Sequence, residues 1–239
     1  MRTSIVNGRI GVLLMAIGLA FDAQAGALAR LTAALPDAPE PPVGGAFWIA
    51  PSMRMNGLPM TLKGFQSRLS PDELLDFYRS QMAQRSGHEY RYSRNDEWQI
   101  LSIRASRYHI TVQARATPGG SDGTILVSGA PGSETPVITT DFPHPDTTRL
   151  LSRQEYDDAG IESEHLSLSS LRPVGVEAQA FVTELDRAGW QIVRRQGMQA
   201  TKRGVVVEAQ HDTQQALLVL QPDRRNPAST AIVIVWRKT

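Results

Sequence analysis

The sequence predicts an α+β protein of two tandem β-α-β-β-β-β modules, each with one helix packed on an antiparallel sheet. Three observations predict this fold class. An amphipathic helix pattern, SPDELLDFYRSQMAQRSG, covers residues 70–87, and a looser version, GVEAQAFVTELDRAGW, returns at 175–190. Strand patterns surround both helices in the same order, and the closing hairpins, 110–128 and 217–236, have loops of similar length. A repeat of about a hundred residues indicates domain duplication, because solenoid units are roughly 20–50 residues long.

Residues 1–25 have the layout of an export signal. Arg2 and Arg9 are followed by the apolar run IGVLLMAIGLAF and by the small-residue site AQA at 23–25. The alternative is a transmembrane anchor, but a run of about 12 residues is short against the roughly 20 that cross a bilayer. We therefore expect cleavage near Ala25-Gly26, no transmembrane span afterwards, and a periplasmic or secreted protein.

Residues 26–57 are predicted to form a Pro-rich extended arm. The stretch LPDAPEPPVGG holds a proline cluster that cannot sustain helix or sheet hydrogen bonding. Such an arm is either a flexible leader or a segment that threads onto a partner. The apolar stretch FWIAPSM, 47–53, is expected to pack on the first module.

The first module is predicted to cover residues 58–130. Its helix begins at Ser70, a good N-cap, with Pro71 at the first helical position and Glu73 completing a capping box. Leu74, Phe77, Tyr78 and Met82 form one apolar stripe, and Gly87 ends the helix. Strands are expected in MTLKGFQSR before the helix and in HEYRYS, EWQILSIRA, YHITVQAR and GTILVSG after it.

An acidic linker is predicted at 131–165, where eight acidic residues stand against two basic ones. The second module, 166–239, repeats the element order. Its helix turns Phe181, Leu185 and Ala188 inward, and Gly189-Trp190 follows it. The strongly β-prone end STAIVIVWRKT is either an edge strand, with Arg237 and Lys238 discouraging self-pairing, or a central strand.

This order of a strand, a helix of the type SPDELLDFYRSQM, a glycine and aromatic, and a run of strands resembles exported bacterial proteins with duplicated helix-grip-like α+β modules. These include the BamC-like accessory proteins of outer-membrane assembly. The resemblance covers roughly 58–130 and 160–239 and implies a binding or assembly role without catalysis. The chain has no cysteine, which excludes a lipid-anchored lipoprotein, a disulfide scaffold and thiolate chemistry.

Short motifs of the common hydrolases, nucleotide-binding proteins and zinc proteases are missing from the sequence. We expect no catalytic residue, no cofactor and no metal. The nearest approach to a metal site is TDFPHPD, where Asp141, His144 and Asp146 share one loop whose prolines either stiffen a site or extend a linker. Paired carboxylates at Asp157-Asp158 and at Glu162 and Glu164 are interpreted as a solvated charge run.

One strand carries a candidate binding surface. HEYRYSRNDEW interleaves aromatic and basic residues, and alternation puts Tyr90 and Tyr92 on one face of the strand. These side chains either belong to a half-buried strand or recognise an acidic envelope polymer, whereas a neutral exported protein is not expected to bind nucleic acid. The proposed binding surface comprises Tyr90, Arg91, Tyr92, Arg94, Arg104 and Arg107.

The sequence favours a non-enzymatic exported interaction protein, an accessory factor of a secretion, pilus or outer-membrane assembly system. Its partners are expected to be envelope proteins, bound by edge-strand pairing. One alternative is a periplasmic ligand- or polymer-binding protein, which requires an apolar pocket of roughly 300 Å³ or more beneath a helix. The other is an unrecognised hydrolase, which requires polar residues from both modules to converge in one cleft.

Overall fold

The structure is a computed structural model that describes residues 35–83, 89–105, 107–130, 137–158, 160–197 and 204–238. The predicted export signal, 1–25, and the predicted helix end at Gly87 lie outside these residues. The helices within them are α1 (Pro71–Ala83) and α2 (Val174–Arg187). The strands of the first half are β1 (Gly44–Met55), β2 (Leu58–Ser67), β3 (Glu89–Arg94), β4 (Gln99–Arg104), β5 (Tyr108–Thr117) and β6 (Gly120–Gly129). Those of the second half are β7 (Thr148–Asp158), β8 (Ile161–Ser170), β9 (Gln191–Gly197), β10 (Val205–His211), β11 (Gln214–Pro222) and β12 (Thr230–Lys238).

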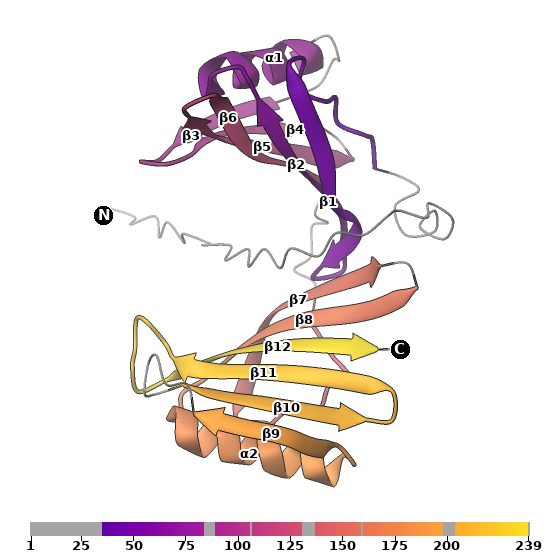
Figure 1. Ribbon diagram of the computed structural model, residues 1–239, viewed down its shortest axis with the longest axis vertical. Helices are drawn as coiled ribbons and strands as arrows, with labels where there is room; N and C mark the ends of the chain where they lie inside the picture. The colour runs from indigo at the N-terminus through magenta and orange to yellow at the C-terminus, as the bar shows by residue number, and fades with distance from the viewer. Residues whose placement is uncertain are drawn as a thin grey trace, which may run out of the picture.

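All twelve strands belong to one antiparallel sheet, in the order β3-β4-β5-β6-β2-β1-β7-β8-β12-β11-β10-β9. The predicted α+β fold of two tandem β-α-β-β-β-β modules, each with its own sheet, is therefore wrong. The described chain is mostly β, with two short helices, and its sheet runs unbroken through the pair β1 and β7. Figure 1 shows β1 reaching out of the strands around it to lie beside β7.

The two joining strands occupy segments for which the sequence predicted an arm and a linker. β1 lies within 26–57, and β7 lies within 131–165 together with the start of β8. Both strands change register along their length, β1 around Ala50 and β7 between Leu150 and Ser152. Pro51 stands at the irregular part of β1, a position where a strand tolerates proline because the regular hydrogen bonding is already interrupted.

Helix α1 begins where its sequence predicts. Ser70 Oγ donates to Glu73 Oε2 at 2.7 Å, and the Ser70 amide donates to the same carboxylate oxygen at 2.9 Å. This local bonding holds the first turn, and it lowers the pKa of Glu73. Leu74, Tyr78 and Met82 are buried against the sheet, so the apolar stripe is core.

Helix α2 has no side-chain cap hydrogen bond at its start, where Pro173 is the N-cap. It ends through Gly189, whose φ of +83° lets the Trp190 amide donate back to the Leu185 carbonyl at 2.8 Å. Phe181 and Leu185 are buried as predicted, whereas Ala188 is exposed. The buried residues of α2 extend from Val174 to Leu185, and Ala188 lies just beyond the last helical residue, Arg187.

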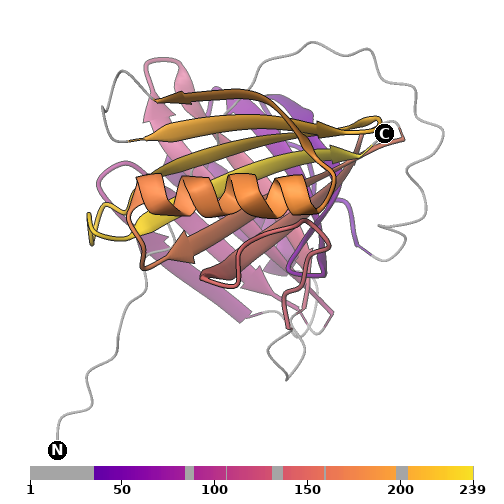
Figure 2. The same cartoon turned by 90° about the horizontal axis from the view of Figure 1, so that it is seen from below.

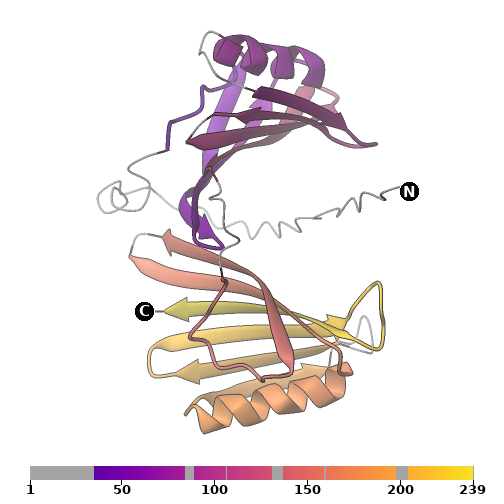
Figure 3. The ribbon, with the colours of Figure 1, turned by 180° about the vertical axis from the view of Figure 1, so that it is seen from behind.

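Each helix covers its own apolar cluster. One cluster joins α1 to β4, β5 and β6, and the other joins α2 to β8, β10, β11 and β12. The helices lie at opposite ends of the molecule, with the strands between them (Figures 1 and 3). Figure 2 shows α2 lying over the face of the strands of the second half. The joining strands therefore connect two separate cores.

The segment before β1 is packed where the structure describes it. Ala38 is buried in the α1 cluster, and Tyr78 Oη donates to the Pro39 carbonyl at 2.9 Å. Asp37 forms an ion pair with Lys63 Nζ at 2.8 Å. Ala38, Pro39 and Asp37 thus attach this segment to the first half, within the range for which the sequence predicted a Pro-rich extended arm, 26–57.

Candidate functional site

Among the strands that the structure describes, β3 and β9 lie at the two edges of the sheet. The C-terminal strand β12 is not one of them, because it lies between β8 and β11, which supports the second of the two sequence readings. All six residues of β3 are exposed. An edge strand of this kind presents unpaired backbone N–H and C=O groups to any chain that approaches it.

Most of the residues in the predicted binding surface lie at the β3 edge. Tyr90, Arg91, Tyr92 and Arg94 belong to β3, Arg104 ends the neighbouring strand β4, and Arg107 lies in the turn before β5. The structure divides this set between two faces of the sheet. Tyr90 and Tyr92 lie opposite the buried residues Ile103 and Leu101, which face α1. Arg91 and Arg104 lie on the other face, where Arg104 approaches Glu89 at 3.8 Å with both side chains exposed.

A groove runs between α1 and β3. Its volume is about 410 Å³, and it is lined by Asp72, Leu75, Asp76, Arg79, Tyr90, Tyr92 and Leu101. The ring of Tyr92 is oriented by a hydrogen bond from its Oη to Gln99 Oε1 at 2.7 Å. Tyr90 and Tyr92 are 38% and 52% exposed, so their rings form an apolar floor that α1 leaves uncovered. The groove lies beside the helix and not beneath it, since Leu74 and Tyr78 seat α1 on the sheet.

The opposite edge is arranged differently. Arg195 of β9 donates from Nη1 to Gln179 Oε1 of α2 at 2.7 Å, so a polar bridge spans the space between strand and helix. Val193 of β9 is 60% exposed and lines a depression with residues of β10, β11 and β12. Both edges therefore present an exposed strand beside a depression, and at the β3 edge that depression lies between the strand and the helix.

A second site lies where the two halves of the sheet join. A pocket of about 400 Å³ is lined by Ser52, Met53, Arg54, Arg153, Glu155, Tyr156, Asp157, Glu162, Ser163, Glu164 and Lys238, from β1, β7, β8 and β12. Polar residues from both halves of the chain thus meet in one cleft, the arrangement that the hydrolase hypothesis requires. The carboxylate at its centre is already paired with cations, which favours a role in recognition or stability.

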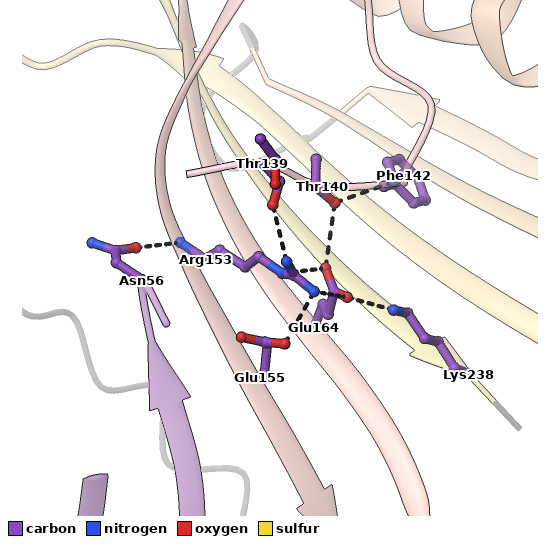
Figure 4. A network of polar contacts seen from close by, with 8 residues as sticks. All are labelled: Asn56, Thr139, Thr140, Phe142, Arg153, Glu155, Glu164 and Lys238. Atoms are coloured by element: carbon purple, nitrogen blue, oxygen red, sulfur yellow. Dashed lines mark hydrogen bonds and ion pairs between the residues drawn. The ribbon is translucent and has the colours of Figure 1, made fainter. Parts of the chain in front are cut away.

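That carboxylate belongs to Glu164, whose side chain is 3% exposed. Arg153 donates to it from Nε at 3.0 Å and from Nη2 at 2.7 Å, and Lys238 forms a further ion pair with it. Figure 4 shows Arg153 and Lys238 approaching the carboxylate from two sides. Arg153 also binds Glu155 at 3.0 Å and the Thr139 carbonyl at 3.1 Å.

Two ionisable groups in this region have shifted pKa values. Burial acts to raise the pKa of Glu164, but the hydrogen bonds from Lys238 and Arg153 outweigh it and hold that pKa below its usual value. Burial lowers the pKa of His165, whose ring contacts the Tyr156 ring in a tilted arrangement with 4.8 Å between centroids. Glu164 is therefore ionised and His165 neutral near neutral pH.

The backbone near this pocket also couples the two halves. The Asn56 amide donates to the Arg153 carbonyl at 2.8 Å, and the Arg153 amide donates to Asn56 Oδ1 at 2.9 Å. Asn56 holds a positive φ of 52° in the turn between β1 and β2. This reciprocal pair extends the three register pairs that join β1 to β7.

The sequence did not identify the pocket. Asp157, Glu162 and Glu164 were interpreted as part of a solvated charge run, yet Glu164 is buried, and Asp157 and Glu162 line the pocket. Acidic residues at alternate positions, 155, 157, 162 and 164, were the signal in the sequence that could have indicated this pocket. In the loop that holds Asp141, His144 and Asp146, His144 Nδ1 contacts Thr148 Oγ1 at 2.9 Å. Within the described ranges, no group of three or more His, Cys, Asp or Glu residues is placed to hold a metal ion.

Comparisons of the chain with protein families, with curated proteins and with solved structures find no match. Neither helix in the described part of the chain is long and apolar enough to span a membrane.

Proposed function

We propose that this protein is a non-enzymatic binding protein that takes up an extended segment of a partner polypeptide at the β3 edge. The observation that carries the proposal is the coincidence of a fully exposed edge strand with an open groove beside α1. In strand addition, backbone hydrogen bonds to the edge supply affinity, and pockets for alternate side chains supply specificity.

The groove offers such a pocket. Alternate side chains of an added strand would point to the α1 face, where Tyr90 and Tyr92 present apolar surface. Large flat rings bury much area and lose little conformational entropy on binding. The groove therefore favours an apolar or aromatic side chain at every second position of the partner.

The charges around the edge restrict the partner further. Arg91 lies on the outer face of β3, with Ser102 opposite it and Ser93 two residues later on the same strand. Neither serine carries a charge that would balance Arg91, so this part of the edge is basic. On the α1 side, Asp72 and Asp76 border the groove, with Arg79 already paired to Asp76 at 2.8 Å. A segment with acidic residues on one face and apolar residues on the other complements both surfaces.

The predicted export signal supports a location of this protein in the cell envelope. The partner would then be an envelope protein, and the protein would serve as an accessory factor of a secretion, pilus or outer-membrane assembly system. This assignment rests on residues 1–25 and on the sequence pattern alone.

Selection from a displayed library of random linear peptides tests this function with the full mature chain. We expect enriched peptides in which apolar residues alternate with polar or acidic ones, and we expect Tyr90→Ala/Tyr92→Ala to lower their affinity about tenfold or more. Val193→Ala, an exposed residue of the other edge, is the matched control and should leave affinity unchanged. A selection without alternating peptides, or equal loss in the control, would contradict the proposal.

A further inference from the structure

One wall of the groove beside β3 is a single side of helix α1. Four of the lining residues follow the helix at spacings of three, four and seven residues: Asp72, Leu75, Asp76 and Arg79. Residues at these spacings lie along one side of a helix. Leu75 is buried, whereas Asp72 and Asp76 are exposed. A side chain that enters the groove therefore meets two carboxylates along the wall formed by α1.

This wall carries an excess of negative charge. Asp76 Oδ1 pairs with Arg79 Nη2 at 2.8 Å, and both side chains are exposed. Asp72, one turn nearer the start of α1, forms no ion pair among the residues that the structure describes. The lining thus holds two carboxylates against one guanidinium. A cationic group that enters the groove would balance the carboxylate of Asp72.

The aromatic floor of the groove also suits a cation. Tyr90 and Tyr92 are both partly exposed on the α1 face of β3. The Tyr92 hydroxyl donates to Gln99 Oε1, so the part of this side chain left for a ligand is its ring. Aromatic rings attract cations electrostatically, and arginine is the cation most often found against them. Two such rings in one groove with a carboxylate distinguish a cationic side chain from a neutral one of the same size.

The position of α1 requires a long side chain. Helix α1 packs over β4 and β5, whereas an added strand would lie about 4.8 Å beyond β3. A side chain of that strand must therefore extend across β3 to reach the helix. Arginine has an apolar stem that can lie along the tyrosine rings while its charged end stays in water or meets a carboxylate. Its planar guanidinium can donate two parallel hydrogen bonds to that carboxylate.

We propose that the groove selects an arginine side chain of the bound segment, at one of the positions that point to α1. The guanidinium pairs with Asp72, and the stem lies against Tyr90 and Tyr92. The other positions that point to α1 remain apolar. This selection rests on the proposed strand addition at β3, and it specifies the residue that the partner carries opposite the helix.

Guest substitutions in a bound peptide test this site. In a peptide enriched by the selection described above, each residue of the apolar, α1-facing set is replaced in turn by arginine and by citrulline. Citrulline has the shape of arginine without its charge. Binding to the full mature chain is measured by fluorescence anisotropy. At one position we expect the arginine peptide to bind about tenfold more tightly than the citrulline peptide.

Variants of the protein connect this preference to the groove. Asp72→Asn should reduce the ratio of the two affinities to about one and leave the citrulline peptide unaffected. Tyr92→Leu should also reduce the ratio, whereas Tyr92→Phe keeps the ring and should retain most of it. The matched control is Asp186→Asn, which removes the same charge from an exposed position of α2 and should retain the full ratio.

Two results overturn the selection of arginine while peptide binding itself stands. One is a ratio of about one at every α1-facing position of the wild type. The other is an equal loss of both peptides in Asp72→Asn, which is the effect of a structural role at the start of α1. If no peptide binds, or if Tyr90→Ala/Tyr92→Ala leaves binding unchanged, the strand addition and the selection of arginine are both refuted. The wild-type ratio decides the outcome even where a variant does not fold.

Discussion

Removal of the Glu164 carboxylate is expected to destabilise the protein more than removal of any exposed carboxylate on the same strand. Glu164 is 3% exposed, and its partners Arg153 and Lys238 are 23% and 27% exposed. Deleting one member of a buried ion pair costs about 3–5 kcal/mol, because the remaining charge is left uncompensated. Arg153 keeps Glu155 and the Thr139 carbonyl, so we expect the lower end, about 3 kcal/mol, for Glu164→Ala.

The conservative variant Glu164→Gln keeps the side-chain shape and removes only the charge. We expect it to lower the free energy of unfolding by about 2 kcal/mol, since the amide oxygen still accepts one hydrogen bond from Arg153. The measurement is urea denaturation at pH 7 followed by tryptophan fluorescence, because Lys238 lies over the Trp236 ring at 4.0 Å. Glu162→Gln, two residues away and exposed, should change stability by less than about 0.5 kcal/mol.

The same variant has a predicted pH signature. The pKa of Glu164 is lower in the folded state than in the unfolded state, so its stabilising contribution is present above the unfolded pKa. That contribution is lost as pH falls from the unfolded pKa through the lower folded pKa. Wild type should therefore lose stability in this range faster than Glu164→Gln. Equal stability of the two proteins at pH 7, or parallel acid profiles, would refute the reasoning.

Three further predictions concern the fold. Gly123→Ala would place a Cβ 1.8 Å from the Gln113 carbonyl oxygen and should lower the free energy of unfolding, measured by urea denaturation, by at least about 2 kcal/mol. Gly45→Ala is the control, because its Cβ meets no atom within 4 Å and should be tolerated. Tyr78→Phe removes the hydrogen bond to the Pro39 carbonyl, so we expect the free energy of unfolding to fall by about 1 kcal/mol. We also expect faster proteolysis within 35–43, because this hydrogen bond attaches the segment to α1. An unchanged cleavage rate would refute the role of Tyr78 in holding the segment. Because burial lowers the pKa of His165, the unfolded state binds a proton more readily, and stability should fall as pH drops from 7.5 to 5.5. His165→Gln should abolish this loss, as measured by urea midpoints at both pH values.

The helices were predictable because their signals are local. Ser70, Pro71 and Glu73 specify the start of α1 within one turn, and the burial of Leu74, Tyr78 and Met82 follows from their spacing. Most strands around them also follow from alternation. The joining of these strands into one sheet was not predictable from such patterns. It depends on Met53–Met55 pairing with Gln154–Tyr156, about a hundred residues later, in strands whose alternation is broken by register shifts.

The candidate sites were likewise predictable from the sequence only in part. Period-two alternation correctly puts Tyr90 and Tyr92 on one face, but only the sheet order shows that their strand is an edge. The network around Glu164 takes Arg153 from β7 and Lys238 from β12, so its members become neighbours through strand pairing alone. A single sequence does not show which residues of different strands are paired. The charged residues around Glu164 were therefore interpreted as a solvated linker, although Glu164 is buried.

The central claim is that β3 receives a partner strand, and site-specific photocrosslinking in the native host tests it most directly. A photoreactive amino acid would replace Ser93 of β3 in one strain and Val193 of β9 in another, both exposed edge positions. The account predicts a discrete crosslinked envelope protein from position 93 that disappears in the Tyr90→Ala/Tyr92→Ala background, and no such product from position 193. Crosslinks of equal yield from both edges, or none from β3, would contradict it.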